Sequence, residues 1–216
     1  MLLLDALSPA PRTVRMFLLE KGLDIPARQV DVFSGENRQA PFLGHNPAGQ
    51  TPALLLEDGT AIAESVAIME YLEECHPAPA LIGSTPLERA IARQWQRRAE
   101  LNITEHIHNA YHYAEGLARF HDRIPVAPEA AAGLKRVAQD RIRWLDGMLE
   151  GRPFLAGERF TFADIWLYAW LDFADSVGQP FAEDLAWIRP WFERIGQRPA
   201  ARASLHPACR PGGVRG

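Results

Sequence analysis

Three short strings in the N-terminal part of this 216-residue chain could together hold a small peptide and activate a nucleophile. The first is SPAPR at residues 8–12, which links the first predicted strand to the first predicted helix and places Ser8 near the positive end of that helix. A hydroxyl donor beside the positive end of a helix favours a negatively charged ligand atom. An ordinary turn serine also fits this string, and taken alone that interpretation is the stronger one.

The second string is NPAGQTPAL at residues 46–54. Pro52 precedes an apolar segment, and because proline cannot donate to a sheet ladder it must lie at a strand start, an edge or a turn. Holding an X-Pro bond cis costs only about 0.5–1 kcal/mol. A cis Thr51-Pro52 bond would leave the Thr51 N–H and C=O free for an extended peptide ligand. A trans proline in a loop-to-strand turn fits the spacing equally well.

The third string is AES at residues 63–65, which opens a helix directly after a strand. The Ser65 N–H, its hydroxyl and the helix N-terminus make an anion site suited to a carboxylate. Glu64 adds a negative group that can hold an ammonium, and an amino-acid head group needs both. Taken alone, a routine helix start is the stronger interpretation of this string, since Glu and Ser are common there.

Strand and helix signals alternate in the segment that positions these strings. Strands are predicted at residues 2–4, 28–32, 53–56 and 60–63, with a hairpin turn at Asp58-Gly59 between the last two. Helices are predicted at residues 13–21, where Gly22 ends the helix, and at residues 64–75, with a short helix between the second and third strands. This order predicts one small mixed sheet with helices packed against it.

The composition changes at residues 76–86, HPAPALIGSTP, which reads as a linker. Beyond it only helices are predicted: from 86 to about 115, from about 128 to 150, from 161, and around 183. Thr161 and Asp164 have capping-box spacing, which we assign to stability. The predicted boundaries are a sheet domain at 1–77, a linker at 78–86, an all-helical domain at 87–207 and a flexible tail at 208–216.

Charge and composition narrow the class of partner. The net charge of −4, from 23 basic and 27 acidic residues, argues against nucleic acid or an anionic membrane as the main partner. No stretch approaches the roughly 18 apolar residues of a membrane helix, and the N-terminal segment is too short for a signal peptide. Cys75 and Cys209 are far apart in the sequence, so a reduced, cytoplasmic setting is expected.

Taken together, the strings resemble the cytosolic glutathione S-transferase superfamily, in particular its bacterial, serine-type, theta-like members. In that superfamily a strand-to-helix turn holds the catalytic residue, an NPxGxxP segment carries a cis-proline, and a Glu-Ser or Gln-Ser pair opens the third helix. NPAGQTP and ES match in order and spacing, and the resemblance covers about residues 2–207. It implies an α/β thioredoxin-like N-terminal domain that binds glutathione, an all-α C-terminal helix bundle, a homodimer and a role in detoxification.

The resemblance also assigns roles to residues. It makes Ser8 the catalytic group, pairs the Thr51 backbone beside Pro52 with the cysteinyl part of glutathione, and gives Glu64 and Ser65 the γ-glutamyl end. The paired prolines of the SPAPR string leave open whether Ser8 or a backbone N–H stabilises the thiolate.

Asn37 and Gln50 occupy positions where theta-like members place basic residues towards the glycine carboxylate of glutathione. Both are neutral here, which predicts a weaker grip on that carboxylate. Arg12 either compensates or is a solvated charge in the first helical turn, and the second alternative is favoured.

The electrophilic acceptor is expected between the domains, against Pro11, His108, Tyr111 and His112. Two histidines four residues apart invite a metal interpretation, but no third ligand is evident, so no metal is expected. The predicted reaction is attack of the glutathione thiolate on an electrophilic carbon. The alternatives are a non-catalytic glutathione transferase-like binding protein and a glutathione-dependent dehalogenase or peroxidase.

Overall fold

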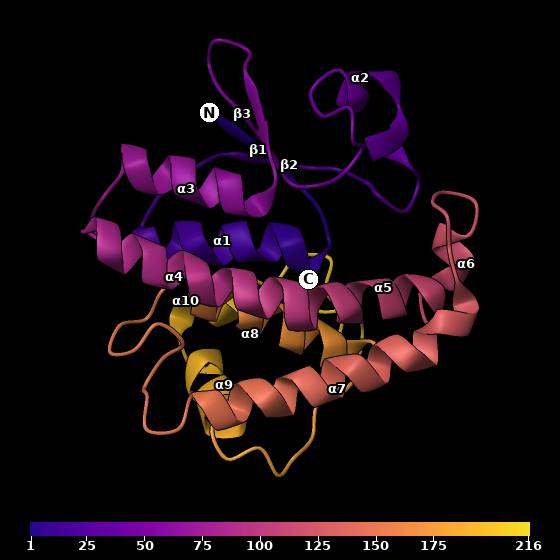
Figure 1. Cartoon of the computed structure of the whole chain (residues 1–216). Helices are drawn as coiled ribbons and strands as arrows, with labels where there is room; N and C mark the ends of the chain where they lie inside the picture. The colour runs from indigo at the N-terminus through magenta and orange to yellow at the C-terminus, as the bar shows by residue number, and fades with distance from the viewer.

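A computed structural model describes all residues, 1–216, and shows a small sheet and its helices stacked on an all-helical half (Figure 1). The strand order is β2-β1-β3-β4. β1 (Leu2–Asp5) runs parallel to β2 (Ala27–Gln29) and antiparallel to β3 (Ala53–Leu55), which forms a hairpin with β4 (Ala61–Ala63). This arrangement confirms the predicted mixed sheet.

Alternation along the strands divides the N-terminal core into two layers. Leu3 and Leu54 face α1 (Pro9–Lys21) and α3 (Ser65–Cys75) and belong to the main core. Leu4 points to the opposite face, because successive strand side chains alternate, and packs with Phe42 of α2 (Ala40–Leu43). The central strands β1 and β3 are therefore buried on both faces, and α1 and α3 lie between the sheet and the helical half (Figure 1).

The second strand is shorter than predicted and ends at Gln29. The Val30 N–H still donates to Asp5 O, but the chain then turns. The Asp31 carboxylate accepts the N–H groups of Phe33 (2.9 Å) and Ser34 (3.1 Å). An Asp side chain that bonds the backbone two or three residues on closes a turn locally, which stops the strand.

After residue 85 helices are the only regular elements, joined by loops, and the chain forms no further strand. The predicted helix from residue 86 is confirmed as a continuous run in which α4 (Pro86–Ala99) passes through a π-helical turn, η2 (Glu100–Thr104), into α5 (Glu105–Tyr113). Single π-turns inside α-helices are frequent at functional sites. The remaining elements are η1 (Glu36–Arg38), α6 (Leu117–Phe120), η3 (Pro128–Ala130), α7 (Ala131–Met148), α8 (Phe162–Ser176), α9 (Ile188–Gly196) and α10 (Pro199–Ala203).

The helix α8 forms the centre of the helical half and is buried along most of its length. The predicted capping box at its start is confirmed, because Asp164 accepts the Thr161 N–H at 2.9 Å. The same carboxylate accepts the Leu155 N–H and the Trp191 Nε1–H, each at 3.0 Å. One side chain thus ends the preceding loop, starts α8 and fixes α9.

The helix predicted around residue 183 begins later, at Ile188. Its N-terminal N–H groups are accepted by Asp146, which belongs to α7. Asp146 accepts from Ala186 (3.2 Å), Trp187 (2.9 Å) and Ile188 (2.7 Å). The start of α9 is therefore set by a contact across the bundle instead of by a local capping residue.

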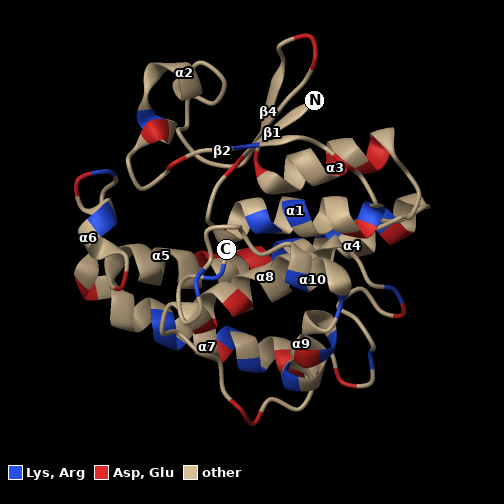
Figure 2. Cartoon of the chain, turned by 180° about the vertical axis from the view of Figure 1, so that it is seen from behind, with Lys and Arg blue, Asp and Glu red and all other residues tan.

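Only the end of the segment 208–216, which the sequence predicts to be a flexible tail, packs against the body of the protein, because residues 210–212 are exposed and residues 213–216 are not. Arg215 forms ion pairs with Asp172 (2.7 Å) and Asp175 (2.5 Å) of α8. Gly216 is buried, and a Cβ placed on it would lie 2.6 Å from the Ser8 nitrogen. These ion pairs give the tail a fixed path that brings it to the start of α1, where the C-terminus lies in Figures 1 and 2. None of the helices is both long and apolar enough to cross a membrane.

Candidate active site

A cavity of about 760 Å³ opens between the sheet and the helical half. This volume lies within the range of small-molecule sites. All the predicted site residues except Pro11 line it: Ser8, Asn37, Gln50, Thr51, Pro52, Glu64, Ser65, His108, Tyr111 and His112. Pro11 is buried and does not reach it, whereas Pro9 does. Positions two apart on a helix point about 200° from each other, so only one of these two prolines can face the cavity.

The start of α1 offers few hydrogen-bond donors, and Ser8 is one of them. Ser8 has extended backbone (φ −161°, ψ 154°), and its hydroxyl does not cap the helix. Pro9 and Pro11 have no N–H. The Arg12 N–H donates to Ser8 O at 3.2 Å, whereas no backbone hydrogen bond engages the Ala10 N–H. The Ser8 hydroxyl and the Ala10 N–H are therefore the donors that this turn can direct at an anion.

Two asparagines hold the loop before β3, Asn46 from within the loop and Asn37 from η1. Asn46 Nδ2 donates to Gln50 O (2.8 Å), and Asn37 Nδ2 donates to Gly49 O (2.5 Å). The Thr51-Pro52 bond is cis, and no backbone hydrogen bond within the chain engages the Thr51 N–H or C=O. The Asn37 amide thus braces the loop, and its buried Oδ1 has no partner in the chain.

Glu64 has an unusual backbone conformation at the start of α3. Its φ of 67° makes it the one non-glycine residue with a positive φ. Such a conformation costs roughly 1–3 kcal/mol and is concentrated at functional sites. The Glu64 side chain is exposed on the cavity wall and takes part in no ion pair.

Ser65, next in the chain, differs in part from its predicted role. Its Oγ donates to Ala10 O at 2.9 Å, so the single hydroxyl proton links α3 to α1. The N–H groups at the start of α3 are what remains to bind a carboxylate.

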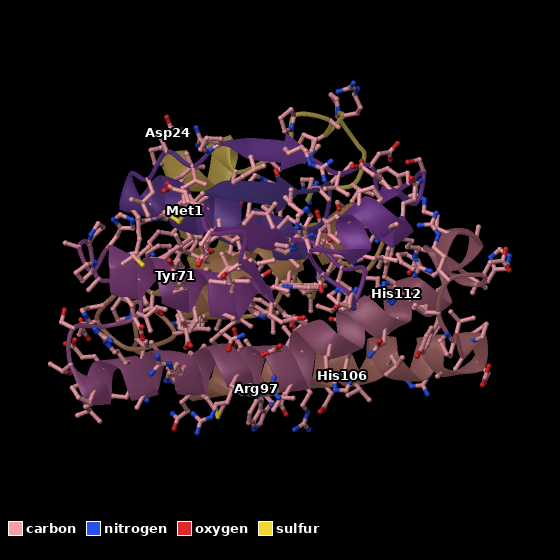
Figure 3. All side chains as sticks on the ribbon, turned by 90° about the horizontal axis from the view of Figure 1, so that it is seen from above. Met1, Asp24, Tyr71, Arg97, His106 and His112 are labelled. Atoms are coloured by element: carbon pink, nitrogen blue, oxygen red, sulfur yellow. The ribbon has the colours of Figure 1, made fainter.

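Aromatic and imidazole rings line the helical side of the cavity. The His108 ring lies 4.1 Å from that of His112 and 5.0 Å from that of Trp170, and the His112 ring lies 4.0 Å from that of Phe120. Burial lowers the pKa of His108 to about 3 and that of His112 to about 4, so both imidazoles are neutral near pH 7. Figure 3 places His112 where α5 meets the N-terminal half.

Arg12 follows neither of the alternatives predicted for it. It is 1% exposed and does not line the cavity. Its Nη1 lies 2.5 Å from Asp172 Oδ2, and its other donors reach Ser204 Oγ and Ala201 O. Arg12 therefore joins α1 to the helical half instead of binding a ligand or solvent.

Among the cavity residues that the sequence analysis did not identify are three arginines, Arg38, Arg119 and Arg123, which we call the arginine wall. They come from η1, from α6 and from the loop after α6, so no motif relates them. Arg123 donates to the carbonyl oxygens of Val32 (2.9 Å) and Phe33 (3.0 Å). The wall therefore spans the two halves of the protein at one end of the cavity.

Comparison with known proteins gives matches along most of the chain. The family models for the glutathione S-transferase N-terminal and C-terminal domains match residues 7–75 and 119–199. The chain is 33% identical over 202 residues to glutathione S-transferase 2 of Saccharomyces cerevisiae, covering 91% of this chain and 85% of that protein. It is 33% identical over 207 residues to maleylacetoacetate isomerase of Pseudomonas aeruginosa, covering 92% and 91%. The crystal structure of Gtt2 from Saccharomyces cerevisiae matches with a TM-score of 0.89 and 32% identity, covering 95% of this chain and 100% of that one.

Proposed function

The chain belongs to the glutathione S-transferase family and is an enzyme of that class, and we propose that it joins the glutathione sulfur to an electrophilic carbon of a small molecule. The observation that carries the proposal is a single cavity that is lined by residues of both the sheet half and the helical half. One wall presents the Ser8 turn, the Thr51 backbone and the start of α3, and the other presents the aromatic rings of α5 and α8.

The N-terminal wall supplies groups that match the parts of glutathione. The unpaired Glu64 carboxylate suits the γ-glutamyl ammonium, and the N-terminus of α3 at Ser65 suits its carboxylate. The free N–H and C=O of Thr51 suit the cysteinyl amide, as a strand would. This alignment directs the cysteine sulfur towards Ser8, and it leaves Gln50 to contact the glycine end.

The chemical demand on Ser8 is modest. Lowering a thiol pKa by about two units requires about 2.7 kcal/mol of preference for the thiolate. One hydrogen bond to a charged group contributes about 1.5–3 kcal/mol, and a helix N-terminus adds about 0.3–1 kcal/mol. The Ser8 hydroxyl with the Ala10 N–H at the start of α1 is sufficient, and the thiol proton leaves to solvent.

The proposed reaction needs only glutathione and the electrophile. The thiolate lone pair forms the carbon–sulfur bond, and the leaving group departs with the electron pair of the bond that breaks. Neutral His108 and His112 lie on the acceptor side of the cavity, where they offer hydrogen bonds without adding charge.

Replacing Ser8 with Ala tests the proposal. We expect kcat with 1-chloro-2,4-dinitrobenzene to fall about tenfold and the pKa of bound glutathione to rise by about one unit, read from thiolate absorbance. The matched control is Ser84→Ala, which removes a hydroxyl outside the cavity. An unchanged rate in Ser8→Ala would assign the thiolate to the Ala10 N–H. Glutathione binding by the wild type without thiolate or product would favour a non-catalytic binding protein. A homodimer is part of the proposal and is tested by sedimentation equilibrium.

A further inference from the structure

The arginine wall holds three guanidinium groups that form no ion pair within the chain. Arg97, the other arginine on the cavity, is neutralised by Glu100 at 2.9 Å. Arg38 Nη1 donates to Arg123 O (3.0 Å), and Arg123 donates to two backbone carbonyls, so these bonds fix the groups without cancelling their charge. Three positive charges therefore lie on the cavity wall without an ion-pair partner in the chain.

The carboxylates that are nearest in the sequence to the arginine wall form no ion pair with it. Glu36 pairs with Arg28 and accepts the Asp31 N–H at 2.7 Å. Asp31 accepts the N–H groups of its own turn. Asp122 lies 3.0 Å from His121 and is highly exposed. The cavity is also lined by four acidic residues, which lie on other elements than the three arginines: Glu64 and Glu70 at α3, Glu100 in η2 and Glu105 in α5.

The guanidinium group of Arg119 lies against aromatic side chains of the cavity wall. Its guanidinium carbon lies 4.5 Å from the centre of the Phe33 ring, and its Nη1 lies 3.5 Å from the Tyr111 hydroxyl. Tyr111 in turn makes edge contacts with Phe120 and Phe173, with ring centres 6.0 and 5.1 Å apart. Figure 2 shows one basic position on α6 and another in the loop beside it, on the side that faces the segment leading from β2 to α2.

We propose that the arginine wall binds a carboxylate on the acceptor, so that the preferred substrates are aromatic electrophiles that carry a carboxylate. This inference rests on the proposed conjugating function. The aromatic rings contact the acceptor ring, while Arg119 pairs with its carboxylate and Arg123 holds the two sides of the cavity together. Arg119 belongs to the aromatic side of the cavity and lies in the helical domain, whereas Gln50, which the proposed function assigns to the glycine end of glutathione, lies in the sheet domain.

A matched pair of probes tests it: 4-chloro-3,5-dinitrobenzoate and the corresponding neutral benzamide. In both, the thiolate forms a bond to the carbon that bears chlorine, and chloride leaves with the electron pair. We expect the wild type to prefer the benzoate, relative to the uncatalysed rates, by about three- to fivefold in kcat/KM. Arg119→Gln should abolish this preference and leave the benzamide rate within about twofold. Salt should weaken the preference, since the guanidinium is exposed.

The control is Arg136→Gln, which removes an exposed, unpaired arginine of α7 outside the cavity and should keep the preference. Equal losses on both probes in Arg119→Gln, or a wild type without preference, would overturn the inference while leaving conjugation intact. A rise in the KM for glutathione with unchanged probe selectivity would overturn it by assigning Arg119 to glutathione. Absence of conjugation with either probe would instead overturn the proposed function, and the inference with it.

Discussion

Replacing Asp164 with Ala should lower the free energy of unfolding by about 3–5 kcal/mol. Asp164 is 0% exposed and accepts four hydrogen bonds, one from the Thr161 hydroxyl (3.2 Å) and three from N–H groups that would lose their partner: Leu155 N–H (3.0 Å), Thr161 N–H (2.9 Å) and Trp191 Nε1–H (3.0 Å). Each buried donor left unsatisfied costs roughly 1–3 kcal/mol, and partial relaxation keeps the sum near the lower end. For a chain of this size the loss corresponds to a fall in Tm of roughly 10 °C.

The chain contains its own control, because the same motif starts α4. There Glu88 accepts the N–H groups of Ser84 (2.8 Å) and Thr85 (3.2 Å) at the protein surface. Water can replace an exposed carboxylate, so Glu88→Ala should cost only about 0.5–1 kcal/mol. Urea unfolding at pH 7.5, followed by tryptophan fluorescence at one protein concentration, measures both variants. Equal losses of unfolding free energy in the two variants would refute the claim that the burial of the carboxylate, and not the capping motif itself, determines the size of the loss.

Two further predictions concern groups whose burial the sequence does not reveal. Burial holds the pKa of His108 near 3, whereas the pKa of an unfolded histidine is 6.5. As the pH falls below about 6.5, the unfolded chain therefore binds a proton at this position that the folded chain does not, and the free energy of unfolding decreases. Asp164, whose pKa is raised to about 6, contributes the opposite slope at roughly pH 4–6. The wild type should therefore lose more stability than His108→Asn between pH 7 and 5 in urea titrations, and a pH-independent difference between them would contradict this. Arg12→Ala should cost about 3 kcal/mol by leaving Asp172 partly unpaired, with the KM for glutathione changed less than twofold. A large rise in that KM would restore a role for Arg12 in binding.

Features controlled by adjacent residues were predictable from the sequence. Gly22 ends α1 with φ 66°, and Gly59 closes the β3–β4 hairpin with φ 89°, because both turns need a backbone conformation that glycine adopts without strain. The Thr161–Asp164 capping box is likewise a local pattern. The cavity residues of the three N-terminal strings lie together because two of the strings occupy strand-to-helix turns of one small sheet and the third leads into a neighbouring strand of the same sheet.

Features controlled by distant partners were not predictable in this way. The start of α9 depends on Asp146, and the burial of Arg12 depends on Asp172, which lies 160 residues further along the chain. The arginine wall combines side chains from η1, α6 and the loop after it, whose proximity follows only from the packing of the two domains. Single-residue chemistry cannot separate such arginines from solvated ones before the fold is known.

The position of Ser8 illustrates how such distant contacts enter the active site. Asp172 of α8 receives Arg12 from α1 on one oxygen (2.5 Å) and Arg215 from the tail on the other (2.7 Å). The same tail places Val214 on the cavity wall and Gly216 against the Ser8 backbone. One buried carboxylate therefore fixes both the helix that follows Ser8 and the segment that packs on it. Because a hydrogen bond to a thiolate depends on the placement of its donor, the geometry of the Ser8 turn rests on the helical domain as much as on the sheet that carries it.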